Sequence, residues 1–316
     1  MSDKLFDIRG HETREIYSRK VPLWSLTNFN RPHAKYLLIV LRVLQACLLT
    51  QRMIHADEYW QGTEAAYDVV YGGVQLPWEW NTRFRLRNTI YPYYLAAPLF
   101  VLKQLGLDYN LAVRCCPYLA HCILVCIGDH YLWKVGIKTV GLPSTRIAFV
   151  LYLASANANM LMIRCFTNSV ETIFLIVAFY YFLHVKKRFD RNIVIMTALI
   201  SLSFMIRNTA PIGWIPLLLV KIICEGSFNI FLRAGVFVAL PVIGFGIFLD
   251  SIYYGSDQIT MTFLNFLTVN VIENRSASFG TEPPLSYVTQ YLPGYFHLAY
   301  PVLIFALYFY YQGMRK

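Results

Sequence analysis

The order of apolar and polar positions along the chain predicts a series of membrane-crossing helices. A transmembrane helix needs about 17–25 mostly apolar residues. The apolar stretches are continuous, whereas the strands of a membrane β-barrel alternate apolar and polar residues. We therefore expect an all-α polytopic membrane protein. The stretches that meet or approach the spanning length are 36–54, 111–132, 146–163, 168–185, 192–209, 211–224, 230–250 and 295–312.

Residues 91–107 form a further apolar stretch with an ambiguous pattern. They contain Pro92 and Pro98 and carry Lys103 near their end. If the first helix crosses to the non-cytosolic side, residues 91–133 must make one net crossing although they resemble two helices. We therefore predict that 91–107 is re-entrant or lies at the membrane interface, and that 111–132 makes the crossing.

The positions of lysine and arginine predict the orientation of these helices. Basic residues concentrate in 1–35, 133–146 and 185–191, and basic loops remain in the cytosol. This places the basic N-terminal segment in the cytosol and puts loops 55–90 and 251–294 on the opposite side. Since residues 1–35 lack the apolar stretch of a signal peptide, we expect the first helix to be a retained anchor.

The composition excludes several other classes of protein. Of the 316 residues, 57% are hydrophobic and 15% are charged, whereas soluble domains average about 25% charged residues. The net charge of +10 is explained by basic cytosolic loops rather than by nucleic-acid binding. The seven cysteines form no CxxC pair, and we interpret them as small buried apolar residues. We expect residues 36–316 to form a single multi-span domain.

Loop 55–90 carries the clearest chemical signal. Asp57 and Glu58 directly follow the first helix, where partial burial raises the pKa of a carboxylate and suits it to general-base catalysis. A solvated acidic loop with interfacial aromatic residues is the plainer interpretation. Loop 251–294 contains an N-glycosylation sequon at Asn274, which agrees with a position outside the cytosol.

Two arginines lie at helix ends on the side that faces this acidic loop. Arg164 and Arg207 stand beside Asn and Thr residues, and such a combination binds phosphate well; the alternative is an arginine that snorkels to the membrane surface. Arg42 lies in the middle of the first helix and needs a partner. These residues suggest an enzyme that acts on a phosphate-bearing lipid or a proton-coupled transporter. The charges cluster at one membrane edge, which favours the enzyme.

Several segments of the chain, in the same order, resemble a known family. The motif HADEYWQ is similar to the H-P-D-E-x-x-Q signature of the dolichol-phosphate-mannose-dependent mannosyltransferases, glycosyltransferase family 22, which have GT-C architecture. The other segments resemble later blocks of that family. The matching segments are 55–61, 78–80 with 85–92, 164–172, 250–255 and 264–283.

The resemblance implies a GT-C fold with a large first lumenal loop that carries the acidic motif. It also implies a multi-pass protein of the endoplasmic reticulum membrane, with a cytosolic N-terminus and lumenal catalysis. The donor would be dolichyl phosphate mannose, and the transfer would invert the configuration at mannose C1. The sequence WEW at 78–80 favours the glycosylphosphatidylinositol (GPI) branch and transfer of the third GPI mannose in α1,2 linkage.

Three alternatives remain open. The chain resembles enzymes that extend the lipid-linked N-glycan precursor or add a fourth GPI mannose. It also departs from the family, because Ala56 and Asn208 stand where prolines are usual and the chain ends at Lys316, before further helices of the family. A truncated, non-catalytic relative is therefore the third alternative.

The resemblance assigns roles to individual residues. The catalytic residues would be Asp57, as the base, and Glu58, as its orienter or second acid. We expect no cofactor beyond the donor substrate, no metal and no nucleic acid, with the lipid-linked donor, the GPI-precursor acceptor and membrane lipids as partners. The expected donor-phosphate residues are Arg164 and Arg207, with Arg85 and Arg87 as alternatives, and the expected acceptor-binding residues are Trp78, Glu79 and Trp80.

Overall fold

The computed structural model describes residues 27–255, 259–275, 277, 280, 282–296 and 299–314. The described residues form α-helices with short 3-10 and π segments and include no strand, which confirms the all-α prediction. The chain divides into two compact units, residues 1–266 and 267–316, which are described separately. The first 26 residues, most of the predicted N-terminal segment, lie outside the described residues, and the single-domain prediction remains a prediction.

The first unit contains most of the helices and all of the family segments except 264–283, which continues into the second unit. Its long helices are α2 (Pro32–Leu48), α5 (Ile90–Gln104), α6 (Asn110–Ala154), α8 (Thr167–Phe182), α9 (Arg191–Ile206), α10 (Trp214–Glu225) and α12 (Leu240–Tyr253). Its shorter elements are α3 (Ala56–Glu58), η1 (Tyr59–Thr63), α4 (Glu64–Tyr71), η2 (Trp78–Trp80), α7 (Ala156–Met162), η3 (Ala210–Gly213), α11 (Phe228–Ala234), η4 (Gly235–Ala239) and most of α13 (Thr262–Leu267).

The second unit consists of short helices followed by one longer helix. They are η5 (Thr268–Ile272), η7 (Tyr287–Tyr291), α14 (Leu292–Phe296) and α15 (Ala299–Met314). The predicted loop 251–294 therefore contains several helical turns, because its apolar and aromatic residues are numerous enough to form local helices. The bend between residues 287–296 and 299–313 is 114°.

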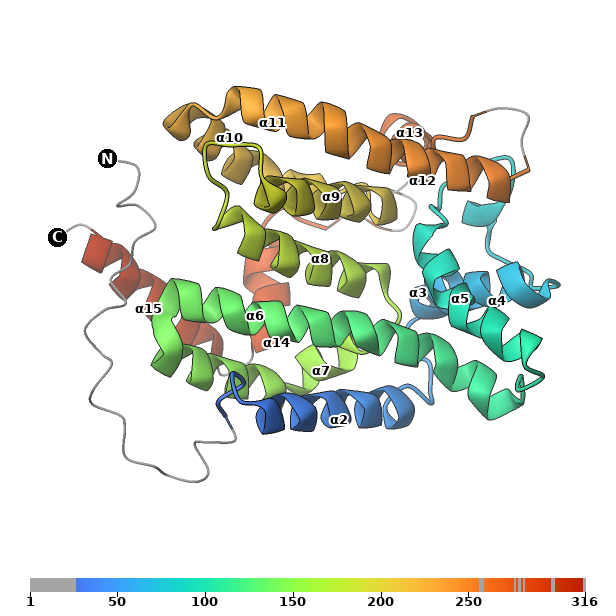
Figure 1. The fold of residues 1–316 in the computed structure, drawn as a ribbon, viewed down its shortest axis with the longest axis horizontal. Helices are drawn as coiled ribbons and strands as arrows, with labels where there is room; N and C mark the ends of the chain where they lie inside the picture. The colour runs from blue at the N-terminus through green and yellow to red at the C-terminus, as the bar shows by residue number, and fades with distance from the viewer. Residues whose placement is uncertain are drawn as a thin grey trace. The chain divides into compact units, whose positions relative to one another are not determined.

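Helix α6 is a hairpin of two antiparallel limbs rather than one straight rod (Figure 1). The limbs join at Gly141, where φ is +78°, a backbone conformation that glycine adopts without strain. A Cβ atom added at Gly136 would lie 2.6 Å from the side chain of Thr145, so the limbs approach closely here. The break falls inside the predicted cytosolic segment 133–146, and the two limbs correspond to the predicted crossings on either side of it.

Several helices are suited to a membrane. Among the described residues, 110–154 and 228–253 are long and apolar enough to cross one, and two bent helix pairs raise the number to four if each pair is one span. This confirms the coarser prediction of membrane-spanning helices. Helix α5 has 15 residues, fewer than a crossing needs, and it packs through Tyr91, Leu95 and Leu99 in the core. Whether α5 is re-entrant remains a prediction.

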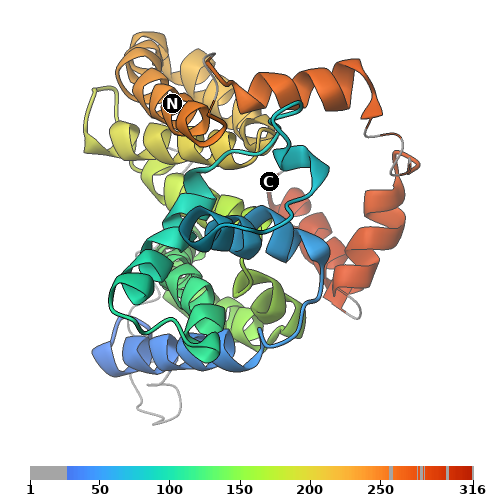
Figure 2. The same ribbon diagram turned by 90° about the vertical axis from the view of Figure 1, so that its right-hand side faces the viewer.

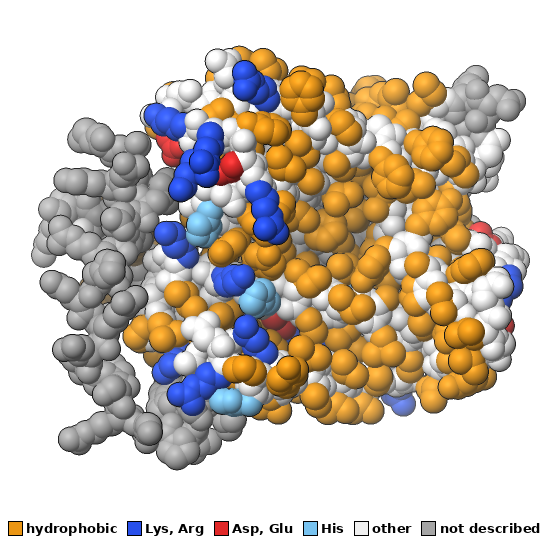
Figure 3. Space-filling model, in the orientation of Figure 1, with side chains coloured by type: hydrophobic (Ala, Val, Ile, Leu, Met, Phe, Trp, Pro, Cys, Tyr) orange, Lys and Arg blue, Asp and Glu red, His pale blue; other side chains and the backbone are white. Residues whose placement is uncertain are grey.

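The long helices of the first unit lie side by side, so their ends form two opposite faces (Figure 1). We call one face the basic end; it carries the basic residues of 134–146 and 186–191. Figure 3 shows lysine and arginine side chains gathered at this end, beside a broad apolar band. We call the other face the motif end; it carries 55–90 and 164–168. Figure 2 looks at the motif end, with α3 and α4 in front of the longer helices.

Candidate active site

One helical stretch from Ala56 to Tyr71 presents the acidic motif. It consists of α3, the π segment η1 and α4 without interruption, and π segments occur frequently at functional sites. His55 caps its N-terminus, because its Nδ1 accepts a hydrogen bond from the backbone N–H of Asp57 at 3.2 Å. The predicted loop is therefore largely helical where the motif lies.

Asp57 and Glu58 are neighbours in sequence but differ in their surroundings. The side chain of Asp57 is 50% exposed, with an oxygen 3.8 Å from His55 Nδ1, whereas the side chain of Glu58 is fully buried. Six residues beyond Glu58 on the same stretch, burial raises the pKa of the Glu64 carboxyl. Of the two motif acids, only Asp57 is accessible to a substrate.

Glu58 forms a buried ion pair with Arg164. The two carboxylate oxygens lie 2.9 and 2.7 Å from Arg164 Nη1, and the Tyr118 hydroxyl donates a further hydrogen bond of 2.8 Å to Glu58. Arg164 also donates to the backbone carbonyls of Leu49 (2.6 Å) and Arg52 (2.9 Å), and Leu49 is the C-cap of α2. The pair therefore fixes the motif stretch to the end of the first helix.

The terminal nitrogens of Arg164 are occupied by these contacts, and the residue is 1% exposed. Its Nε atom has no hydrogen-bond partner among the described residues. The donor-phosphate role predicted for Arg164 remains untested. In the geometry observed, Arg164 holds Glu58 and the acidic motif in place.

A second set of contacts joins two of the family segments, 55–61 and 164–172, to each other and to Arg207. The Thr167 hydroxyl donates to Gln61 Oε1 at 3.1 Å, which ties the acidic motif to the first turn of α8. Arg207 donates to the amide oxygen of Asn168, and its Nε lies 2.9 Å from Glu171. The side chain of Arg207 is 31% exposed. Of the two arginines predicted first for the donor phosphate, Arg207 is therefore the accessible one.

Gly62 allows the motif stretch to approach the 163–166 turn. A Cβ atom added at this position would lie 2.7 Å from the carbonyl oxygen of Cys165, a backbone atom that cannot move without shifting the neighbouring Arg164. Glycine is required here because of the close approach, and its own φ is ordinary. The sequence motif gave no indication of this constraint.

The WEW segment divides into a buried and an accessible half. Trp80 is 6% exposed, donates its indole N–H to the Trp60 carbonyl at 2.8 Å, and packs edge-on against Tyr253. Trp78 is 36% exposed and packs edge-on against Phe84. Trp80 therefore belongs to the local core, whereas Trp78 keeps a surface on which a sugar can stack.

Glu79 and Arg87, predicted for different substrates, contact each other. Their side chains form two parallel hydrogen bonds of 2.8 Å, the bidentate geometry that gives arginine–carboxylate pairs their strength. Arg85 follows a different course, with a positive φ of 48° and its Nε donating to the Thr82 carbonyl at 2.6 Å. None of these arrangements tests the predicted binding roles.

Asp250 is a buried residue to which the sequence analysis assigned no role. It accepts hydrogen bonds of 2.8 Å from the backbone N–H and hydroxyl of Thr89, the Asn88 amide and the Thr262 hydroxyl. The signal available in the sequence was a single acid at the end of an apolar run. A carboxylate that is buried there needs hydrogen-bond donors such as these. Asp250 fixes residues 85–92, which contain Arg85 and Arg87, to α12.

Comparison with known proteins agrees with this arrangement of motifs. The model of the Alg9-like mannosyltransferase family matches residues 34–315. The chain is 32% identical to "GPI alpha-1,2-mannosyltransferase 3" of Homo sapiens, over 81% of this chain and 45% of the relative. It is 30% identical to the Bos taurus protein of the same name, over 90% and 53%, and 30% identical to "GPI mannosyltransferase 3" of Yarrowia lipolytica, over 82% and 51%.

The chain belongs to the Alg9-like mannosyltransferase family, because the family model covers nearly its whole length. It spans about half the length of the curated relatives it matches. No solved structure matches it. The family resemblance of the sequence motifs is confirmed.

Proposed function

We propose that this chain is a mannosyltransferase that transfers mannose from dolichyl phosphate mannose to a GPI-anchor precursor, in α1,2 linkage, at the lumenal side of the endoplasmic reticulum membrane. Family membership and the names of its relatives support the reaction class. The observation that carries the proposal is the position of Asp57. Its accessible carboxylate lies beside a buried Glu58–Arg164 pair that anchors the motif.

In the proposed reaction, Asp57 removes the proton from the acceptor hydroxyl while that oxygen attacks C1 of the donor mannose. The new C1–O bond forms as the bond from C1 to the phosphate oxygen breaks, and the configuration at C1 inverts. Dolichyl phosphate leaves as an anion, and the proton remains on Asp57. A positioned base of this kind contributes about 10²–10⁴-fold to the rate.

The accessible arginines are the residues we assign to the leaving phosphate. The Arg207 side chain contacts Asn168 and Glu171 and would exchange one of them for the phosphate. Arg85 lies on the segment that Asp250 holds. A preorganised cation stabilises negative charge that develops in the transition state. Arg87 is the alternative, and it would have to exchange Glu79 for the phosphate. Arg164 keeps Glu58 in place, and Trp78 offers an aromatic surface to the acceptor glycan.

Complementation of cells that lack the third GPI mannosyltransferase tests this proposal. We expect the wild-type chain to restore GPI-anchored protein at the cell surface and Asp57→Asn to fail at equal membrane abundance. Asp68→Asn is the matched control, because Asp68 lies on the same helical stretch and its carboxylate accepts a local backbone hydrogen bond from Val74. Rescue by Asp57→Asn would contradict the base assignment. Failure of the wild-type chain at normal abundance would contradict the proposed acceptor.

Glycosylation at Asn274 tests the proposed orientation. Asn274 is exposed and adopts a positive φ of 52°; Ser276, the third residue of its sequon, lies outside the described residues. If residues 251–294 face the lumen, an endoglycosidase should shift the mobility of the wild-type chain on a gel. The shift should be absent in Asn274→Gln. The orientation would be contradicted if Asn274 is unmodified and residues 251–294 are cleaved by a protease added to the cytosolic side of intact vesicles.

A further inference from the structure

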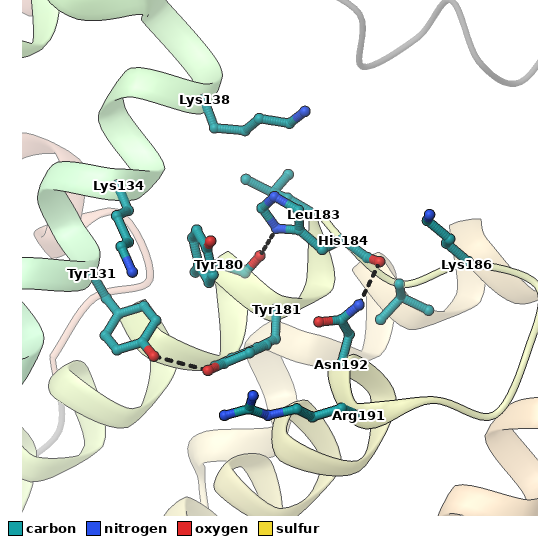
Figure 4. Close-up of a pocket in the computed structure, with 11 residues that line it drawn as sticks. Tyr131, Lys134, Lys138, Tyr180, Tyr181, Leu183, His184, Lys186, Arg191 and Asn192 are labelled. Carbon is teal, nitrogen blue, oxygen red and sulfur yellow. Dashed lines mark hydrogen bonds between the residues drawn. The ribbon is translucent and has the colours of Figure 1, made fainter.

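A cavity of about 640 Å³ lies at the basic end of the first unit. Its walls come from the first limb of α6, the end of α8 and the start of α9. Figure 4 shows lysines of α6 on one side and basic residues of the α8–α9 connection on the other. The motif end lies at the opposite ends of these helices, so the cavity is separate from the proposed active site. The lysine and arginine residues that line it are Lys134, Lys138, Lys186 and Arg191.

The positive charges of this cavity are not neutralised within the described part of the chain. None of the four cationic residues forms an ion pair there, and the residues that line the cavity include neither Asp nor Glu. The nearby Asp190 is engaged elsewhere, because it caps α9 and lies 3.6 Å from Arg188. A concave wall of one charge sign concentrates counter-ions. An anion is therefore the expected ligand.

The walls of the cavity are held in place before any ligand arrives. The hydroxyls of Tyr131 and Tyr181 form a hydrogen bond of 2.8 Å between α6 and α8. Asn192 donates to the His184 carbonyl at 3.1 Å, which fixes the start of α9 to the end of α8 (Figure 4). Lys134 Nζ lies 5.1 Å from the ring centre of Tyr131. Its ammonium group is thus positioned on an aromatic face.

The position of the cavity identifies the class of anion. The basic end borders the broad apolar band of the surface (Figure 3), and an arginine with three lysines suits a phosphate group. Basic pockets between transmembrane helices bind anionic lipid headgroups, and the cytosolic leaflet is rich in such lipids. We propose that this cavity binds the phosphate-bearing headgroup of an anionic phospholipid of that leaflet. The site requires no participation in mannosyl transfer.

Lipid retention by the purified chain tests this inference. The full chain is placed in nanodiscs of phosphatidylcholine with or without phosphatidylserine, and retained lipid is measured by native mass spectrometry. We expect the wild type to retain phosphatidylserine selectively and Lys138→Gln/Lys186→Gln to weaken retention about thirtyfold, since each surface charge contributes about a fivefold effect. The matched control, Lys187→Gln/Arg233→Gln, removes the same charge from exposed positions outside the cavity and should retain the lipid.

Several results would overturn the inference. An equal loss in the control variant would indicate a general charge effect, and absence of selectivity in the wild type would indicate no site. Competition by glycerol phosphate as effective as that by phosphatidylserine would assign the cavity to soluble phosphate esters instead. If tryptophan fluorescence shows that the double variant is misfolded, the single Lys138→Gln variant decides, with an expected weakening of about fivefold.

Discussion

The described part of the first unit contains two buried arginine–carboxylate networks, and they differ in whether an accessible acid stands beside them. Arg42 lies inside the predicted span 36–54 and Asp129 lies near the C-terminal end of the predicted span 111–132; the two side chains are 2.7 Å apart and almost fully buried. Arg164 and Glu58 form a pair of equal length at the motif end. The sequence analysis singles out Arg42 by the cost of a charge inside a membrane and Arg164 by its position at a helix end beside Asn and Thr residues. The charge pairs themselves do not distinguish the two networks.

The difference lies in how completely each arginine is satisfied and in what stands beside it. Arg42 uses all of its N–H donors, on Asp129, Tyr152, Gln45 and Asn159, so the network joins α2 to both limbs of α6 and to α7. The Nε atom of Arg164 has no hydrogen-bond partner among the described residues. Glu58, which pairs with the terminal nitrogen of Arg164, is directly preceded in the sequence by the exposed Asp57. We call the Arg42 network closed, because every N–H donor of Arg42 has a partner, whereas the Arg164 network lies beside an accessible acid.

The largest expected effect comes from opening the closed network. Arg42→Met alone leaves Asp129 buried without its counter-charge and should lower the free energy of unfolding by about 3–5 kcal/mol, measured by equilibrium titration with a denaturing detergent. The double variant Arg42→Met/Asp129→Leu should recover most of that loss and retain activity, because apolar side chains replace a buried pair well. An inactive but stable double variant would show that Arg42 takes part in the reaction.

The equivalent double replacement at the motif end should also leave the protein folded but should abolish most of its activity. Glu58→Leu/Arg164→Met should leave the protein folded in detergent but reduce mannosyl transfer about a hundredfold, since small displacements of a catalytic group have effects of this size. The measurement is radiolabelled mannose incorporated into acceptor lipid by membranes that contain equal amounts of protein. Full activity in this variant would show that the Glu58–Arg164 pair is purely structural, and the two networks would then not differ in function.

Gly62→Ala sharpens the comparison without changing any charge. The added Cβ would meet the Cys165 carbonyl oxygen at 2.7 Å. The backbone must shift to remove this clash, and we expect the shift to lower the free energy of unfolding by about 1–3 kcal/mol. Activity should fall further than stability predicts, because the shift separates the acidic motif from Arg164. Gly244→Ala in α12 is the control, since no atom lies within 4 Å of the corresponding position. Equal effects of the two substitutions would contradict the close-approach argument.

Tyr118→Phe should have the smallest effect. It removes the 2.8 Å hydrogen bond to Glu58 and leaves the Arg164 contacts intact, so we expect a loss of about 1 kcal/mol in unfolding free energy. Mannosyl transfer should fall only a few-fold, measured with the same membranes. A loss as large as that of the Glu58–Arg164 double variant would mean that Tyr118 contacts a substrate directly.

Most of the helical architecture could be predicted from the sequence, because apolar length and basic loops report directly on membrane crossing. The predicted crossings 168–185 and 192–209 match α8 and α9 within a few residues. The turn at Gly141 falls inside segment 133–146, which the basic residues alone predict to be a cytosolic loop. The helical content of 55–90 was underestimated, since its apolar residues pack against neighbours that are distant in sequence.

The candidate site could be predicted only in part. Asp57, Glu58, Arg164 and Arg207 stood out because charge at a membrane edge is unusual. The structure places Glu58 and Arg164 in one network and Arg207 in another, with the exposed Asp57 beside the first. The partners Tyr118 and Asp129 were missed because they lie inside an apolar run. Which arginine remains accessible depends on packing, and the sequence pattern carries no information about it.

The Arg42 network also sets an order of events during synthesis. Asp129 follows Arg42 by 87 residues, so at about 5–20 residues per second the ribosome needs about 4–17 seconds to complete the pair. Tyr152 and Asn159 are made later still. During that interval Arg42 lacks its counter-charge and has only Gln45 as a partner within its own helix, and an unpaired charge is costly inside a bilayer. The polar contacts of the first helix are therefore completed only after both limbs of α6 and α7 have been made.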